Sequence, residues 1–167
     1  RLFILSDSPP EKDVQWSEEG ISSAFKFIQK LWNMHLKIID QINKDHKKDS
    51  SDKLIKYINK FIKKITFNLE NFSYNIIIAN IHELHSFMIG EIKNEYQANT
   101  LKDNYKKILI TLSPIIPHFA NEALKTIDCL NELTWPTYSE ELLKEDKKSF
   151  VIQINGKKRG LIQVKLD

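Results

Sequence analysis

Apolar residues recur every three or four positions over most of the chain, which is the pattern of helices with one buried face. The first predicted helix covers residues 17–43. It begins with Ser17 as N-cap, followed by two glutamates at the positive end of the helix dipole. A short charged connection at 44–52 precedes a second helix, and further helices follow at 74–92 and from residue 101. Long helices with short links predict an up-and-down bundle.

Each predicted helix has its own apolar face, and we expect the faces to meet in one core. In the first helix the face consists of Ile21, Phe25, Ile28, Trp32, His35, Ile39 and Ile42. In the second it consists of Leu54, Ile55, Ile58, Phe61, Ile62 and Ile65. In the third it consists of Ile78, Ile81, Leu84 or His85, Met88 and Ile92, and in the fourth of Leu101, Tyr105, Ile108, Leu109 and Leu112.

Two prolines interrupt the apolar pattern after the fourth helix. Pro114 and Pro117 each lack a backbone donor and restrict the preceding residue, so one helix should end near residue 113 and a short one should cover 118–126. The insert is too apolar for a solvated loop, and we expect the bundle to cover it. We assign His118 a structural role at this corner.

Near the C-terminus the period of the pattern changes to that of strands. Residues 150–154 and 161–166 flank Asn155-Gly156, which is a strong hairpin signal. A strict two-residue turn would place Lys157 opposite Ile154 and mix cations into the apolar face. The pattern therefore predicts a bulged turn with a loop of three or five residues. Because an isolated hairpin is marginally stable, it should begin a further module or lean on the bundle.

Lysine is unevenly distributed, although the net charge of the 167-residue chain is only +3. Exposed helix faces usually intersperse glutamate with lysine, but the polar side of the second helix carries lysine without any acidic residue. This stripe indicates either a surface that faces a polyanion or an ordinary solvated face. Because Arg1 and Arg159 are the only arginines, the composition favours contact with a nucleic-acid backbone over reading of bases.

No residue pattern points to catalysis. Cys129 is the only cysteine, which excludes an intrachain disulfide and fits a reducing cytosol. His82 and His85 lack the third ligand that a metal site needs, so we assign them structural roles. The tryptophans offer stacking surfaces for bases, but their positions favour a core role for Trp32 and packing at segment ends for Trp16 and Trp135. No apolar run approaches the length of a membrane span.

Short phrases follow one another along the chain in a characteristic order. They are Arg1-Leu2-Phe3, Ser8-Pro9-Pro10-Glu11 with Trp16-Ser17, Gly20-Ile21 to Ala24 with Lys26-Phe27-Ile28 and Lys30-Leu31-Trp32, Tyr74-Asn75 with Ala79, Glu83 and Leu84, Leu112 to Glu122 with Ala123-Leu124, Trp135-Pro136, and Val151 to Arg159. Together they resemble the C-terminal part of the bacterial-type leucyl-tRNA synthetase family. Lys26 and Lys30 stand where this family usually has arginine, which keeps the charge but not a bidentate contact.

The resemblance implies a mainly α fold with four parts. They are a connector at 1–16, a helical bundle of the anticodon-binding type at 17–131, a linker at 132–148, and a β-hairpin at 149–167 that starts a small α/β domain. It implies a part of a leucine-tRNA ligase without the catalytic and editing sites, so ATP and Mg²⁺ serve the parent enzyme and no cofactor is expected here. The implied partners are tRNA(Leu) and the upstream catalytic and editing domains, in a cytoplasmic monomer with no membrane contact.

Our hypothesis is that the chain supports the body of a tRNA through its lysines while the parent enzyme acts. The candidate residues are Lys26, Lys30, Lys37, Lys53, Lys56, Lys60, Lys63 and Lys64 on the helices, and Lys157, Lys158 and Arg159 at the hairpin turn. The alternative is a helical protein-interaction module whose lysines form a solvated face.

Overall fold

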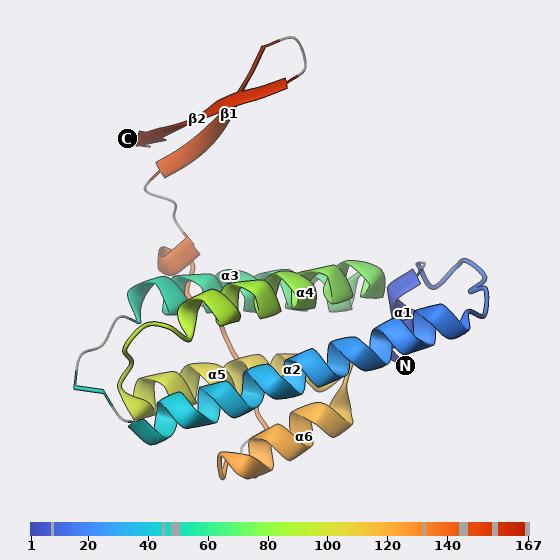
Figure 1. The fold of residues 1–167 in the computed structure, drawn as a ribbon, viewed down its shortest axis with the longest axis horizontal. Helices are drawn as coiled ribbons and strands as arrows, with labels where there is room; N and C mark the ends of the chain where they lie inside the picture. The colour runs from blue at the N-terminus through green and yellow to red at the C-terminus, as the bar shows by residue number, and fades with distance from the viewer. Residues whose placement is uncertain are drawn as a thin grey trace.

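The computed structural model describes residues 1–7, 9–44, 46–47, 51–131, 133–143, 147–154 and 157–165. These residues form a helical bundle followed by a β-hairpin (Figure 1). The helices are α1 (Leu2–Asp7), α2 (Glu18–Lys44), α3 (Asp52–Glu70), α4 (Tyr74–Glu91), α5 (Ala98–Leu112) and α6 (Pro117–Thr126). A short 3-10 helix η1 (Glu141–Leu143) precedes the strands β1 (Lys147–Ile154) and β2 (Lys157–Lys165).

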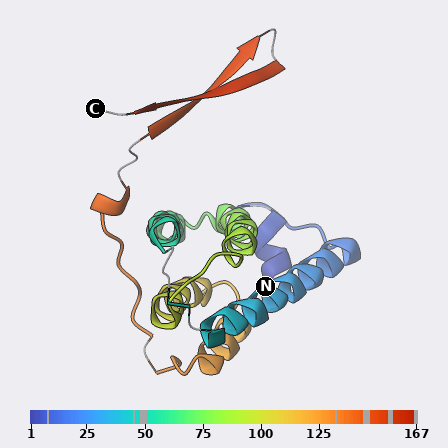
Figure 2. The same cartoon turned by 60° about the vertical axis from the view of Figure 1, so that its left-hand side comes forward.

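The long helices α2 to α5 run alternately in opposite directions (Figure 1). Helix α3 packs against α4 and α5, and α2 packs against α4, α5 and α6. Helix α6 closes the lower side of the bundle, and the short α1 packs on α4 and α2 (Figure 2). The predicted mainly α, up-and-down bundle is confirmed.

Helix α2 begins as the sequence predicts. The backbone N–H of Gly20 donates a hydrogen bond to Ser17 Oγ at 3.1 Å, so Ser17 is the N-cap. Gly20 also permits a close approach of α1, because a Cβ atom at this position would clash with the ring of Phe3. The start of α2 is therefore held both by its cap and by the contact with α1.

The buried face of α2 is displaced from the predicted one. Its buried residues are Phe27, Leu31, Met34, His35 and Ile38. Most residues of the predicted face lie half-buried beside them, and Phe25 is 62% exposed, so the prediction for Phe25 is wrong. The reason is that α2 carries two adjacent apolar stripes. Only the positions of α4, α5 and α6 decide which stripe becomes the centre of the contact.

The buried faces of the other long helices agree with the prediction. The predicted core residues of α3 and α5 are buried, apart from the half-buried Ile55. In α4 the predicted residues Ile78, Ile81, Leu84 and Met88 are buried, whereas the alternative His85 is half-buried. Ile92, also predicted for this face, is half-buried just after the helix ends, so that part of the prediction is wrong.

The proline corner between α5 and α6 also agrees with the prediction. Helix α5 ends at Leu112, and Pro117 occupies the first turn of α6, where its missing N–H costs nothing. Ile115 and Ile116 are buried, and their backbone N–H groups both donate to the carbonyl of Leu112, at 3.1 and 2.9 Å. The apolar insert thus forms part of the core. His118 is exposed at this corner.

The segment 133–143 is anchored on α3. The indole N–H of Trp135 donates to Thr66 Oγ1 at 3.0 Å, and the backbone N–H of Ser139 donates to Asn59 Oδ1 at 2.8 Å. Trp135 is half-buried, as expected for a tryptophan at the end of a segment. The bonds to α3 fix the path of this segment across the bundle (Figure 2). The division of the chain into four parts stays a prediction.

The two strands form an antiparallel hairpin that stands apart from the helices (Figures 1 and 2). Phe150 lies opposite Ile162, and Ile154 lies opposite Lys157. In the described part of the chain, β1 and β2 contact each other and no helix. The alternative that the hairpin leans on the bundle is therefore wrong. Asn155 and Gly156 lie outside the described residues.

A bulge in β2 replaces the predicted longer loop. Ile152 lies opposite Gly160 and Gln153 lies opposite Lys158, so Arg159 is the extra residue. The prediction of a three- or five-residue loop is wrong, since Lys157 pairs with Ile154. The predicted alternation is nevertheless restored, because the extra residue brings Ile162 to the face of Ile152.

Helix α3 ends in a Schellman motif that places Phe72 in the left-handed region. The N–H of Ser73 donates to Asn68 O at 2.8 Å, the N–H of Phe72 donates to Leu69 O at 3.2 Å, and φ of Phe72 is 53°. Glycine is the usual residue at such a position, because a Cβ atom is strained there. The ring of Phe72 is 62% exposed, so little core packing compensates for the strain.

We therefore expect Phe72→Gly to raise the free energy of unfolding by about 1 kcal/mol, which corresponds to a rise of roughly 2–4 °C in Tm. The measurement is thermal and urea unfolding followed by circular dichroism. Phe67→Gly is the matched control: Phe67 is also 62% exposed but lies inside α3, where glycine should destabilise by about 0.5 kcal/mol. Destabilisation by both changes would contradict the argument.

Candidate nucleic-acid interface

One face of the bundle consists of α4 in the middle, α2 on one side and α3 on the other. Helix α4 packs against both neighbours. Lys64 Nζ of α3 lies 3.4 Å from Glu83 Oε2 of α4, and Lys30 of α2 lines a cavity together with residues of α4. We call this surface the α2–α4–α3 face. It comprises Lys26, Lys30 and Lys37 of α2, His82, Glu83, His85, Ser86 and Phe87 of α4, and Lys53, Lys56, Tyr57, Lys60 and Lys64 of α3.

The α3 side of this face combines lysines with a pair of stacked aromatic rings. The rings of Tyr57 and Phe87 are parallel within 5°, with centroids 3.6 Å apart, and Lys53 Nζ lies 5.3 Å from the Phe87 centroid. Lys56 and Lys60 line the same cavity of about 440 Å³. Burial, together with the charge of Glu83, raises the pKa of Tyr57 to about 12, so the phenol stays protonated at neutral pH. This side presents cations around a flat apolar surface.

The α2 side of the face is polar. A cavity of about 480 Å³ lies between α2 and α4 and is lined by Lys26, Lys30, His82, His85 and Ser86, among others. The ring of His82 stacks on Phe27 with a centroid distance of 3.6 Å and an interplanar angle of 20°. The contact with Phe27 fits the structural role predicted for His82. His82 also lines the cavity, which the sequence did not predict.

Several lysines that looked unpaired in the sequence have acidic partners. Lys53 pairs with Glu91 of α4, and Lys64 with Glu83. Lys63 Nζ lies 3.2 Å from Glu140 of the segment after α6. The expectation that the stripe lacks acidic partners is therefore wrong, since the carboxylates come from other elements and not from α3 itself. Exposed pairs such as Lys64–Glu83 contribute little to stability and exchange readily with other anions.

Lys63 differs from the other lysines of α3 in its surroundings. Besides its pair with Glu140, its Nζ lies 5.6 Å from the ring centroid of Tyr138. Both partners belong to the segment that crosses α3, so Lys63 is directed toward that segment. We therefore exclude it from the α2–α4–α3 face.

The hairpin candidates belong to strands that contact no helix in the described part of the chain. Arg159 is exposed and is the bulged residue of β2. Lys157 and Lys158 belong to β2, but their side chains lie outside the described part of the chain. The structure thus groups the lysines of α2 and α3 and leaves the hairpin turn as a separate candidate contact.

Glu91 holds the end of α4 to the start of α3. Its carboxylate is 3% exposed and accepts hydrogen bonds from Lys53, from the hydroxyl of Tyr96 at 2.9 Å and from Asn94 Nδ2 at 3.0 Å. Burial alone would raise the pKa of Glu91, but the bonds from Lys53, Tyr96 and Asn94 outweigh it and lower this pKa below 4.5. Because the folded state lowers the pKa, the stabilisation is present above the ordinary pKa and is lost as the pH falls through the folded value.

We expect Glu91→Gln to lower the free energy of unfolding by about 1–2 kcal/mol at neutral pH, because the charge-assisted bonds are lost. The difference from the unchanged chain should shrink as the pH falls below the ordinary pKa of about 4.5 and should be lost as the pH passes the lower pKa that Glu91 has in the folded chain. Urea unfolding of both chains at several pH values measures this difference in the free energy of unfolding. Glu83→Gln, at an exposed carboxylate of the same helix, is the control and should show no such dependence. A difference that persists unchanged into acid would contradict the assignment.

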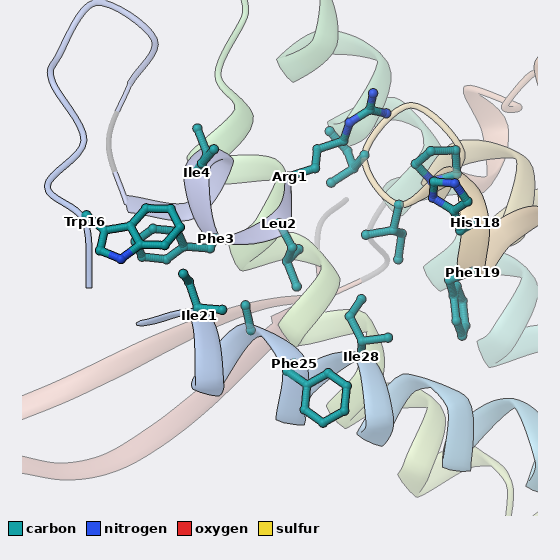
Figure 3. Close-up of a pocket in the computed structure, with 14 residues that line it drawn as sticks. Arg1, Leu2, Phe3, Ile4, Trp16, Ile21, Phe25, Ile28, His118 and Phe119 are labelled. Atoms are coloured by element: carbon teal, nitrogen blue, oxygen red, sulfur yellow. The ribbon is translucent and has the colours of Figure 1, made fainter. Parts of the chain in front are cut away.

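A second, apolar surface lies along the same N-terminal turns of α2 but is lined by other residues of this helix. A groove of about 630 Å³ is formed by α1, the start of α2 and the proline corner (Figure 3). Trp16 and Phe25 line it and are both largely exposed, Trp16 at 72%. The ring of Trp16 lies 6.1 Å from that of Phe3 at an angle of 85°. Ile115 and Phe119 of the corner form the far wall. Such an apolar surface is typical of a contact with another protein element.

Neither metal binding nor membrane insertion has support in the described residues. Among them, no three histidine, cysteine, aspartate or glutamate side chains converge on a point where a metal ion would fit. A search of the same residues finds no helix with the length and apolar character to cross a membrane.

Sequence reasoning missed the aromatic and histidine members of the face. Tyr57 is separated from Lys53 by four residues and from Lys60 by three, so its position within the lysine stripe was a usable signal. The sequence predicts structural roles for His82 and His85, and it does not predict that they line a polar cavity. Their proximity to Lys26 and Lys30 depends on the packing of α2 against α4, which no local pattern reveals.

The bundle, its lysine-lined face and its apolar groove define a helical docking domain. Residues 51–167 match the family described as the anticodon-binding domain of tRNA ligase, and the chain belongs to this family. All of the chain aligns with the leucine-tRNA ligases of Fervidobacterium nodosum, at 35% identity, and of Thermosipho melanesiensis, at 37%. In each case it spans 22% of the relative's length.

The fold is also found in a solved structure. The chain superimposes over its whole length on a part of the Agrobacterium radiobacter K84 agnB2 LeuRS, whose crystal structure is a ternary complex with tRNA and LeuAMS. The TM-score is 0.78 with 19% sequence identity, and the match covers 23% of that chain. At this identity the likeness concerns the fold. The resemblance to leucyl-tRNA synthetases and the predicted bundle are thus confirmed.

Proposed function

We propose that this chain is the tRNA-docking part of a leucine-tRNA ligase. The observation that carries the proposal is the α2–α4–α3 face, on which lysines of two helices flank α4. Lysine is suited to contact with phosphates of the backbone, and such contacts position a nucleic acid without reading its sequence. In the parent enzyme, which couples leucine to tRNA(Leu) with ATP and Mg²⁺, the docking would act by orienting the acceptor end.

The chain contributes no catalytic group in this proposal. The chain acts as one part of the parent enzyme, which we propose to be a cytoplasmic monomer. The candidate contacts are the lysines of the α2–α4–α3 face, with the hairpin turn at Lys157, Lys158 and Arg159 as a second contact. The competing interpretation, a protein-interaction module with a solvated lysine face, requires no affinity for RNA.

The experiment is a direct titration of the chain with a leucine tRNA and with an unrelated tRNA of similar length. We expect binding of both at about 50 mM salt, and a loss of about 1000-fold in affinity at about 200 mM salt, as six or more phosphate contacts release counterions. Absence of binding to either tRNA at the lower salt would contradict the proposal and favour the protein-interaction module.

The apolar groove is the surface on which we propose that the other domains of the same ligase dock. Phe25→Asp should change the free energy of unfolding of the isolated chain by less than about 0.5 kcal/mol, because Phe25 is largely exposed. In the parent enzyme the same change would bury a charge at a domain contact, and we expect leucylation to fall at least about tenfold. The control is Phe67→Asp, which is equally exposed but lies outside the groove. Equal effects of both changes would contradict the role of the groove.

A further inference from the structure

The cavity between α2 and α4 has the composition of an anion site. Lys26 and Lys30 line it from α2, and His82 and His85 line it from α4. Ser23 and Ser86 add two hydroxyl groups, and no carboxylate belongs to its lining. Four nitrogen-bearing side chains without an acidic neighbour in the lining favour a ligand with negative charge.

The two imidazoles are held in place by packing against Phe27 and, for His85, by a hydrogen bond to the backbone. Phe27, which is buried, stacks on His82 and meets the ring of His85 edge-on, with a centroid distance of 5.9 Å. His85 also makes a hydrogen bond to the backbone of Lys30. A ligand that enters the cavity therefore meets donors that are already oriented, which limits the conformational entropy lost on binding.

The charged side chains that act on the pKa of His82 and His85 are all cationic. Burial lowers the pKa of His82 and of His85, and the positive charge of Lys30 lowers both further. Lys37 and His82 act on His85 in the same direction, and Lys26 lines the cavity beside Lys30. From α4, the nearest acidic group in sequence is Glu83, which pairs with Lys64 on the α3 side.

We propose that the cavity between α2 and α4 binds a phosphodiester of the RNA backbone, with Lys26 and Lys30 providing charge and His82 and His85 providing N–H donors. The inference rests on the proposed tRNA docking and assigns a specific phosphate pocket to it. A strand of RNA is favoured over a small free anion because Lys26 and Lys30 are exposed and the cavity belongs to the same face as the lysines of α3. An extended polyanion can contact the lysines of α2 and the lysines of α3, on the two sides of α4, at the same time.

Proton uptake should accompany this binding. A bound phosphate stabilises the protonated imidazoles, so the pKa of His82 or His85 is higher in the complex than in the free chain. A ligand that binds the protonated form more tightly gains affinity as the pH falls from the bound pKa toward the free one. The complex is therefore expected to tighten on acidification through the range in which these histidines titrate.

The test measures the dissociation constant of the chain for a fluorescently labelled leucine tRNA at about pH 6 and about pH 7.5, at constant ionic strength. For the unchanged chain we expect about tenfold tighter binding at the lower pH. The double variant His82→Gln and His85→Gln should lose this pH dependence. The double variant Lys26→Gln and Lys30→Gln should bind about tenfold more weakly at both pH values. Circular dichroism confirms that each variant is folded.

His46→Gln is the control, because His46 lies between α2 and α3 and bonds to Gln41 rather than lining the cavity. It should keep the full pH dependence. If the histidine double variant also keeps it, or the lysine double variant binds like the unchanged chain, the phosphate pocket is refuted while tRNA docking stands. If the unchanged chain binds no tRNA at low salt, both the pocket and the proposed function are refuted.

Discussion

Reversing the charge of three lysines on α3 is expected to weaken tRNA binding by about 100-fold or more, since each lysine at a phosphate contributes on the order of 1 kcal/mol. The change is Lys56, Lys60 and Lys64 to Glu. Lys56 and Lys60 line the cavity beside Tyr57, and Lys64 lies toward α4. The slope of log affinity against log salt should also fall by about three, because three phosphate contacts are lost. Fluorescence anisotropy with labelled tRNA at several salt concentrations measures both quantities.

The control for this change alters the net charge by the same amount elsewhere. Lys12 precedes α2, Lys107 is on α5 and Lys125 is on α6, and none of them belongs to the α2–α4–α3 face. Reversal of these three should reduce affinity only through the change in overall charge. If the two triple variants lose affinity and slope equally, tRNA responds to net charge and not to this face.

Phe119→Ala is expected to have the largest effect on stability among the changes considered, a loss of about 3–5 kcal/mol. Phe119 is 7% exposed, and its ring meets Trp32 edge-on at 6.1 Å and His35 at 6.5 Å. Its removal leaves a void where α6 packs against α2, so the proline corner loses its anchor. Total stabilities of such domains are about 5–15 kcal/mol, which makes this a large fraction.

Urea unfolding followed by circular dichroism measures this loss. Phe25→Ala is the matched control, because it deletes the same atoms from a ring that is 62% exposed, and it should change stability by less than about 0.5 kcal/mol. Equal losses for the two variants would mean that the displaced buried face of α2 is wrongly assigned.

The parts of the fold that local chemistry determines could be predicted from the sequence. Ser17 caps α2, Pro117 begins α6, and the apolar faces of α3, α4 and α5 follow from the helical period. In each case the residues that decide the structure are within a few positions of one another. In the hairpin the alternation predicts a bulge, which β2 contains at Arg159, but the predicted loop of three or five residues is wrong.

The parts that depend on packing between elements could not be predicted. Helix α2 has two apolar stripes, and the neighbouring helices select the one that contains Leu31 and Ile38. The acidic partners of Lys53 and Lys63 are 38 and 77 positions away, so the stripe appeared unpaired. For the same reason, the cavity that brings Lys30 and His82 together depends on the packing of α2 against α4 and leaves no local signal in the sequence.

The face itself offers the most direct test of tRNA docking. Each lysine of the chain is acetylated with a water-soluble reagent in the presence and absence of a leucine tRNA, and its modification is quantified by mass spectrometry. Docking through the α2–α4–α3 face predicts that tRNA protects its lysines, which are Lys26, Lys30, Lys37, Lys53, Lys56, Lys60 and Lys64, whereas Lys12 and Lys125 stay reactive. Uniform modification with and without tRNA, or protection confined to α5 and α6, would contradict the account.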